Sequence, residues 1–134
     1  MKTKNLNLYA KLTEAEKKFL LRHPLDAAPI ALSREKAFAE TKRKFGMNGH
    51  NDSSDAFRHC FWSAVLARDI GYACALEFTT LHESKLENPI LEKEMDLHNN
   101  RVGLDIGKGG GSDSHLSTLC MSALINKRLK VIKQ

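Results

Sequence analysis

Apolar residues recur along most of this chain at the three- to four-residue spacing of helices that bury one face. Thr13-Glu14-Ala15-Glu16 has the form of a capping box and predicts a helix that ends shortly before Pro24. Residues 25–32 form a turn-rich connection, after which Ser33 predicts the start of a second helix that runs to about Phe45.

The same spacing predicts four further helices, over residues 53–70, 72–84, 89–106 and 112–125. The glycine-rich run from Gly107 to Gly111 predicts a flexible break before the last of them. Residues 129–132 alternate and predict a short extended segment. The sequence therefore predicts an all-α fold, a compact bundle of five to six helices with this segment near its C-terminus.

The length of 134 residues, with 42% hydrophobic residues, fits one helical domain over residues 1–134. No stretch approaches the roughly 20 apolar residues of a membrane-spanning helix. Residues 1–5 are charged and no apolar stretch follows them, so we expect neither a signal peptide nor a transmembrane segment. The protein is expected to be cytoplasmic as made, and to remain there or leave through a specialised bacterial secretion system.

The three cysteines, Cys60, Cys74 and Cys120, are odd in number and form no CxxC pair. Each lies among apolar residues of an expected helix. We therefore predict reduced, buried thiols that act as small hydrophobic side chains.

The net charge of +5 is unevenly distributed. Residues 1–46 hold 11 Lys or Arg and 5 Asp or Glu, residues 47–106 hold 5 and 10, and residues 107–134 hold 5 and 1. An acidic middle favours a cation, and basic flanks attract an anion such as nucleic acid, phospholipid or another phosphoester. The alternative is that the lysines only keep a small domain in solution.

The carboxylate of Asp55, the guanidinium of Arg58 and the imidazole of His59 interrupt the apolar start of the third expected helix. Asp55, His59 and Trp62 lie on one face, with Arg58 at its edge. Asp55 can accept a hydrogen bond from one ring nitrogen of His59, which presents the other nitrogen to a metal or substrate. The alternative is an acid that stabilises the helix dipole beside a histidine satisfied in the core.

His82 and Glu83 end the fourth expected helix. In the functional interpretation His82 is a metal ligand or base, and Glu83 is a general base or a second ligand. In the alternative, His82 interacts with the helix dipole and Glu83 lies on the surface.

The fifth expected helix carries Asp96, Asn99, Asn100 and Gly103 on one face. Two consecutive asparagines are poor helix formers and need some compensation. Asp96 can ligate a cation, and Asn100 can hold a substrate or a ligating water. The alternative is a polar seam between helices that sets their packing register. His98 falls off this face, and we expect it to be exposed.

No GxxxxGK[ST], HExxH or GxSxG motif occurs, which counts against nucleotide-binding and serine-nucleophile enzymes. His23, His50 and His115 lie near expected helix boundaries without carboxylate partners, so we assign them no catalytic role.

In these three blocks the chain resembles an uncharacterised bacterial family of domains of unknown function, often found at the C-termini of polymorphic or secreted toxins. The family blocks DAFRHxxW, HE and MDLxNNxxG are matched in order by Asp55 to Trp62, His82-Glu83 and Met95 to Gly103, over about residues 50–106. The resemblance implies a compact helical domain, delivery as a toxin or effector with a cognate immunity protein as partner, and function at the matched residues.

The order of His59, His82 with Glu83, and Asp96 is also similar to the pattern of the HD superfamily of helical metal phosphohydrolases. That superfamily places a histidine, a His-Asp pair and a later aspartate around a metal. Here glutamate stands where the superfamily has the first aspartate.

We therefore predict an enzyme, a metal-assisted hydrolase that acts on a phosphoester or another anionic substrate. A divalent metal ion would be held by His59, His82 and Asp96, and Glu83 would activate a water. Arg58 and Asn100 would stabilise the developing charge. The side chains expected to take part in catalysis are His59, Glu83, Arg58, Asn100 and Asp55.

Two alternatives remain open on the sequence. A metal-independent hydrolase would use His59, oriented by Asp55, as its base and Glu83 as its acid. A non-enzymatic basic helical module would bind nucleic acid or a partner protein, with strong dependence on salt.

Overall fold

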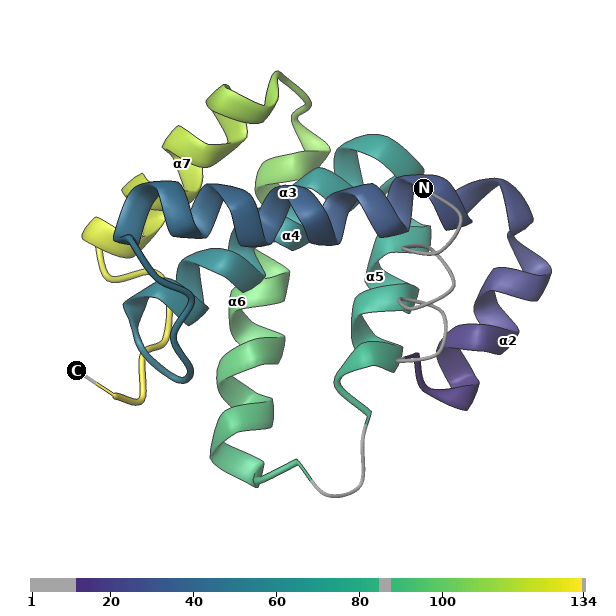
Figure 1. Cartoon of the computed structure of the whole chain (residues 1–134), viewed down its shortest axis with the longest axis horizontal. Helices are drawn as coiled ribbons and strands as arrows, with labels where there is room; N and C mark the ends of the chain where they lie inside the picture. The colour runs from purple at the N-terminus through teal and green to yellow at the C-terminus, as the bar shows by residue number, and fades with distance from the viewer. Residues whose placement is uncertain (1–11, 85–87, 134) are drawn as a thin grey trace.

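The computed structural model describes residues 12–84 and 88–133, and in these ranges it contains six α-helices, one 3-10 helix and no strand (Figure 1). The all-α prediction is confirmed. None of the described helices combines the length and apolar character needed to cross a bilayer. Residues 1–5, on which the signal-peptide expectation rests, lie outside these ranges. In chain order the helices are α2 (Glu14–Arg22), η1 (Pro24–Asp26), α3 (Ala27–Phe45), α4 (Ser53–Ile70), α5 (Tyr72–His82), α6 (Ile90–Lys108) and α7 (Asp113–Ile125).

Helix α4 forms the centre of the bundle and contacts α3, α5, α6 and α7. Figure 1 shows α3 lying across α4, while α5 and α6 run side by side away from it. Of the 18 residues in α4, 12 are buried, so it has no broad solvent-facing side. Phe57, Phe61 and Val65 supply core packing, as the sequence predicts.

Helices α4 and α6 approach so closely that two glycines of α6 have no room for a side chain. A Cβ on Gly103 would lie 2.0 Å from the carbonyl oxygen of Cys60, and one on Gly107 would lie 2.1 Å from that of Ala64. Gly103 and Gly107 are four residues apart and therefore lie on one face of α6. This contact fixes the distance between the polar residues of the two helices.

Helix α3 begins six residues earlier than the sequence predicts, at Ala27 instead of Ser33. Pro29 lies in its first turn, where a proline is tolerated because its missing N–H would have no helical partner. Ser33 lies inside the helix, and its hydroxyl donates a 2.7 Å hydrogen bond to the carbonyl of Ile30.

The other helix ends lie close to their predicted positions, with differences in the capping residues. The capping box of Thr13 and Glu16 is present at α2. Asp52, instead of the predicted Ser53 or Ser54, caps α4 by accepting a hydrogen bond from the Asp55 N–H. Gly107, predicted to open a flexible break, is buried within α6 because its small size allows the contact with α4.

The segment after α7 is held to α6 by Asn99. The side-chain amide of Asn99 donates to the Lys130 carbonyl at 2.9 Å, and its oxygen accepts from the Lys130 N–H at 2.8 Å. His98 is half-buried, with Nε2 2.8 Å from the Arg128 carbonyl, so the predicted exposure of His98 is wrong. Asn99 and His98 therefore anchor the C-terminal segment instead of contributing to the polar face that contains Asp96.

The cysteines agree with the predicted reduced state. All three are free thiols, with Cys60 and Cys120 buried and Cys74 half-buried.

Gly103→Ala is expected to destabilise the protein by about 1–3 kcal/mol, because the added methyl group overlaps the α4 backbone. Urea unfolding followed by circular dichroism measures this difference. The matched control is Gly109→Ala, where the nearest atom outside its chain neighbours would lie 3.5 Å from the new Cβ. We expect the control to change stability by less than ~0.5 kcal/mol. A Gly103→Ala variant as stable as the control would contradict the close helix contact.

Candidate functional site

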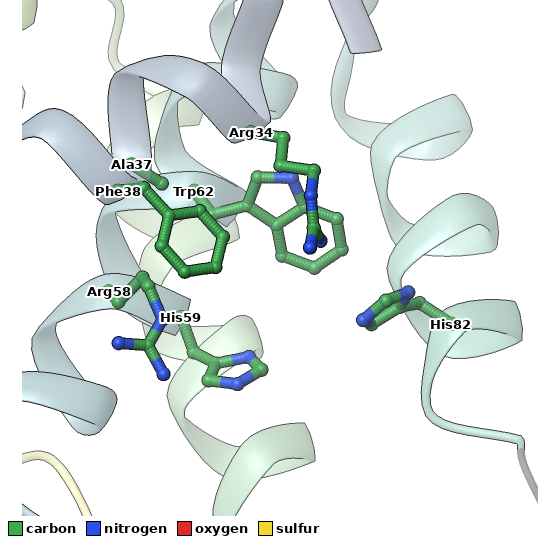
Figure 2. A pocket seen from close by; sticks show the side chains of 7 residues that line it. All are labelled: Arg34, Ala37, Phe38, Arg58, His59, Trp62 and His82. Carbon is green, nitrogen blue, oxygen red and sulfur yellow. The ribbon is translucent and has the colours of Figure 1, made fainter. Parts of the chain in front are cut away.

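A cleft of about 140 Å³ opens between α3, α4 and α5 (Figure 2). Its polar lining is basic, with two guanidinium and two imidazole groups, and such a lining favours an anionic ligand. The lining residues are Arg34, Ala37 and Phe38 of α3, Arg58, His59 and Trp62 of α4, and His82 of α5.

The imidazole of His59 is surrounded by side-chain oxygen atoms. Its Nε2 lies 3.4 Å from Asp55 Oδ1 and 3.3 Å from Asp96 Oδ1. Its Nδ1 lies 3.2 Å from Asn100 Oδ1 and 3.6 Å from Glu83 Oε2. Residues from three parts of the chain thus meet at one ring, as the sequence predicts for a convergent site.

Helical spacing and the α4–α6 contact together produce this arrangement. Asp55 and His59 lie one turn apart on α4, and Asp96 and Asn100 lie one turn apart on α6. Glu83 follows directly after α5, where it is the C-cap residue.

Asp55 is held on both carboxylate oxygens. Its Oδ1 accepts from the Arg58 guanidinium at 2.5 Å, and its Oδ2 accepts from the Asn51 N–H at 2.7 Å. Arg58 also donates to the Gly49 carbonyl at 3.0 Å and to Asn48 Oδ1 at 3.2 Å. The polar loop before α4 is therefore fixed to the site through Arg58 and Asp55.

Asp96 differs from Asp55 because one of its oxygens lacks a partner. Asp96 Oδ1 is buried without a hydrogen bond, although His59 Nε2 lies within ion-pair distance. Such an acceptor is costly to leave unsatisfied. Burial raises the pKa of Asp96 to about 6, helped by the charges of Glu83 and Asp55 and opposed by that of His59.

His59 is strongly biased toward its protonated form. Burial alone would lower the pKa of His59, but its interaction with Asp55 and the charges of Asp96 and Glu83 outweigh burial and raise the pKa to about 9. The pKa of Asp55 is lowered: burial opposes this, but the interactions with His59, Asn51 and Arg58 dominate. At neutral pH the site therefore contains a positive ring beside negative carboxylates.

Asp55, His59 and Asp96 could together hold a metal ion. Each offers one ligand atom, and the three atoms lie within 4.8 Å of one another. Imidazole nitrogen and carboxylate oxygen are common ligands of zinc and of other divalent metals such as manganese. The unpartnered oxygen of Asp96 supports the fit, because a cation would satisfy it.

His82 lies across the cleft from His59 (Figure 2) and outside that group of three ligand atoms. Its Nδ1 lies 2.9 Å from Glu16 Oε2, and its ring centroid lies 5.1 Å from that of Trp62. Metal ligation by His82 stays a prediction without support from this geometry, because the third ligand atom beside those of His59 and Asp96 comes from Asp55.

Glu83 lies on the Nδ1 side of His59. It is 2% exposed and accepts a 3.1 Å hydrogen bond from the Asn100 side-chain amide. This position favours an orienting role toward His59, while the predicted activation of a water by Glu83 stays a prediction.

The sequence does not predict a role in the site for Arg34, which lines the cleft, or for Glu16, which bonds to His82. The capping-box pattern indicates only a local role for Glu16. The guanidinium carbon of Arg34 lies 4.9 Å from the Phe38 ring centroid, and that of Arg58 lies 5.0 Å from it. Burial and the charge of Arg58 lower the pKa of Arg34, against an opposing effect of Glu16. Of the described residues, none accepts a hydrogen bond from Arg34.

Residues 17–132 match the family described as "Domain of unknown function (DUF6973)". The chain belongs to the DUF6973 family. The match reaches well beyond residues 50–106 and confirms the expectation of an uncharacterised domain family, but it carries neither the toxin context nor the HD superfamily. Among curated proteins and solved structures, none matches the chain.

The metal-free DUF6973 protein is expected to lose stability as the pH rises from 7 to 10. The pKa of His59 is raised from 6.5 to about 9 on folding. Protonated His59 therefore contributes on the order of 3 kcal/mol to the free energy of unfolding. This contribution is fully present below pH ~6.5 and is lost as the pH passes through ~9. Urea unfolding in EDTA at each pH measures it. His59→Asn should remove most of the decline, and the control His115→Asn should retain it. An identical decline in both variants would contradict the assignment.

Proposed function

We propose that this protein is a metal-assisted hydrolase of a phosphoester or another anionic substrate. The observation that carries the proposal is the buried, unpartnered Asp96 Oδ1, which lies 3.3 Å from His59 Nε2, an atom that is also 3.4 Å from Asp55 Oδ1. When bound there, a divalent cation would supply a Lewis acid and lower the pKa of a bound water.

The groups on the far side of His59 support its role as a ligand. Only the NH₂ of the Asn100 amide can donate to the Glu83 carboxylate, so the Asn100 oxygen faces His59 Nδ1. That oxygen can accept a hydrogen bond from the Nδ1–H group of His59, which leaves Nε2 free to bind a cation. Such outer partners orient a ligating histidine and make it more basic.

The basic cleft supports the choice of an anionic substrate. Part of the charge of Arg58 is offset by Asp55, but Arg34 has no carboxylate within ion-pair distance among the described residues. A guanidinium group without an acceptor binds phosphate or carboxylate oxygens well.

The elevated pKa of His59 favours the metal-assisted route over the metal-independent one. A general base must be unprotonated to accept a proton. With a pKa of about 9, His59 holds its proton at neutral pH unless a cation displaces it. The metal-independent enzyme, in which His59 is the base and Glu83 the acid, is therefore the second choice.

The toxin or effector role, with a cognate immunity protein, is implied by the resemblance in the three blocks. A toxic hydrolase and a housekeeping hydrolase would use the same site, so the proposal does not depend on this role.

Isothermal titration with Zn²⁺ or Mn²⁺ tests the metal site. A Cys74→Ser background removes a second group of ligand atoms, from His23, Asp26 and Cys74, that also lie within 4.8 Å of one another. We expect Asp96→Asn to weaken binding at least ~10-fold, and the exposed control Asp105→Asn to leave it unchanged.

Binding should strengthen between pH 6 and pH 9, because the proton on His59, with its pKa of about 9, must leave first. The metal association constant should rise by close to ~10-fold per pH unit. Equal affinities in Asp96→Asn and Asp105→Asn, or binding that is independent of pH, would contradict the assigned ligands.

Hydrolysis of bis(p-nitrophenyl) phosphate tests the reaction class. We expect activity that EDTA abolishes and that added metal restores, and a loss of at least ~100-fold in His59→Ala. Activity that survives EDTA would favour the metal-independent route. The basic binding module predicts a different result, with salt-sensitive binding of nucleic acid and no effect of His59→Ala.

A further inference from the structure

We infer that His82 and Glu16 form a proton-transferring dyad on the side of the cleft opposite His59. His82 is the general acid that protonates the leaving group, and Glu16 is the positioning residue that orients it. This inference rests on the proposed hydrolase function of the same cleft, and it assigns a catalytic role to groups outside the candidate metal site.

Glu16 is an unusual capping-box residue because its side chain is both buried and shared. It is 1% exposed. One carboxylate oxygen accepts from the Thr13 N–H at 2.9 Å, which caps α2. The other lies 2.9 Å from His82 Nδ1, although 66 positions separate the two residues in the chain. A single buried carboxylate thus fixes both the start of α2 and the ring of His82.

The charge state of Glu16 determines which nitrogen of His82 is available. Burial alone would raise the pKa of Glu16, but the hydrogen bond and charge of His82, with further help from Thr13, lower it. Glu16 is therefore ionised and can only accept hydrogen bonds. The Nδ1 of His82 must carry the proton in their hydrogen bond, so Nε2 is the nitrogen available to a ligand. Among the described residues, none bonds to that nitrogen.

The position of His82 suits a general acid that acts opposite the metal ligands. Figure 2 shows the rings of His59 and His82 on opposite sides of the cleft. The Trp62 ring lies near both, with its centroid 6.3 Å from that of His59 and 5.1 Å from that of His82. A phosphoester bound between the two histidines would have its attacked face toward Asp96 and its leaving group toward His82.

The proton balance of the step is simple. The oxygen of a water forms a bond to phosphorus, and the bond from phosphorus to the leaving oxygen breaks with its electron pair on that oxygen. The step starts from the doubly protonated ring of His82: the leaving oxygen takes the Nε2 proton, while Nδ1 keeps its proton in the hydrogen bond to Glu16. The proton released by the attacking water returns to Nε2 through solvent, so His82 ends the cycle unchanged. Glu16 stays ionised throughout, as the carboxylate of a catalytic triad does.

Other charged groups also face His82, so pH alone would not identify the dyad. Arg34 of α3 lines the same cleft, and the charge of His82 acts on Asp96 of α6. The dependence of the hydrolysis rate on the leaving group identifies a general acid more specifically. Protonation by such an acid matters most when the departing oxygen is a poor leaving group.

The experiment compares two phosphodiesters in the metal-loaded protein, one that releases p-nitrophenol and one that releases phenol. His82→Ala should slow release of phenol by ~100-fold or more and release of p-nitrophenol by less than ~10-fold. Glu16→Gln should show the same selectivity with a smaller loss, because glutamine keeps the capping box but lacks the charge. The control Thr13→Ala weakens the cap of α2 but keeps both the Glu16 carboxylate and the backbone N–H that bonds to it, and should slow both substrates equally.

Two further measurements keep the inference distinct from the proposed function. Isothermal titration should show unchanged metal affinity in His82→Ala, and a loss of metal binding would make His82 a ligand and overturn the dyad. Nitrogen NMR of the singly protonated ring should show the His82 proton on Nδ1 in the wild type, and a shift of that proton toward Nε2 in Glu16→Gln. If no phosphoester is cleaved, the proposed function fails. A singly protonated wild-type ring with its proton on Nε2 instead of Nδ1, or equal slowing of both substrates by His82→Ala, would overturn the dyad.

Discussion

The direct contact of the α4 and α6 backbones is the constraint on which the candidate site depends. Gly103 and Gly107 leave no space for side chains where they meet α4, so the two helices cannot separate or rotate without losing that contact. At this separation, Asp96 and Asn100, which lie in the turns of α6 before Gly103, reach the ring of His59. A methyl group at Gly103 would therefore affect both the packing and the chemistry.

Within that constraint, the site concentrates opposite charges in a small, largely buried volume. The carboxylates of Asp55, Asp96 and Glu83 surround one imidazole, which stays protonated because they outweigh the effect of burial. Beside this ring, one buried oxygen of Asp96 has no hydrogen bond. The divalent cation that we propose would resolve both features, since it would replace the proton on Nε2 and supply a partner for Asp96. Proton and cation would therefore compete for one place, which would make metal affinity depend on pH.

The sequence predicts the helices well, because their apolar spacing is a local property of the chain. It also predicts that polar residues of α4 and α6 meet Glu83 at the end of α5, because they lie on polar stripes of otherwise apolar helices. The sequence places His82 in the same group, but its ring is bonded to Glu16 instead. Helical spacing of 100° per residue does not decide whether Asn99 shares a face with Asp96. Its actual partner is the backbone of the C-terminal segment, which the helix pattern does not indicate. Glu16 could not be predicted, because a capping-box glutamate satisfies a local pattern completely, and nothing in that pattern indicates His82.

Anomalous scattering from crystals of the protein loaded with Mn²⁺ or Zn²⁺ tests the central claim most directly. The account predicts a peak beside Asp96, at metal–ligand distances of ~2.0–2.2 Å from His59 Nε2 and from oxygens of Asp55 and Asp96. His82 should remain bonded to Glu16 in the same crystals. A peak bound through His82, or no peak beside Asp96 at saturating metal, would contradict the assignment of these three ligands.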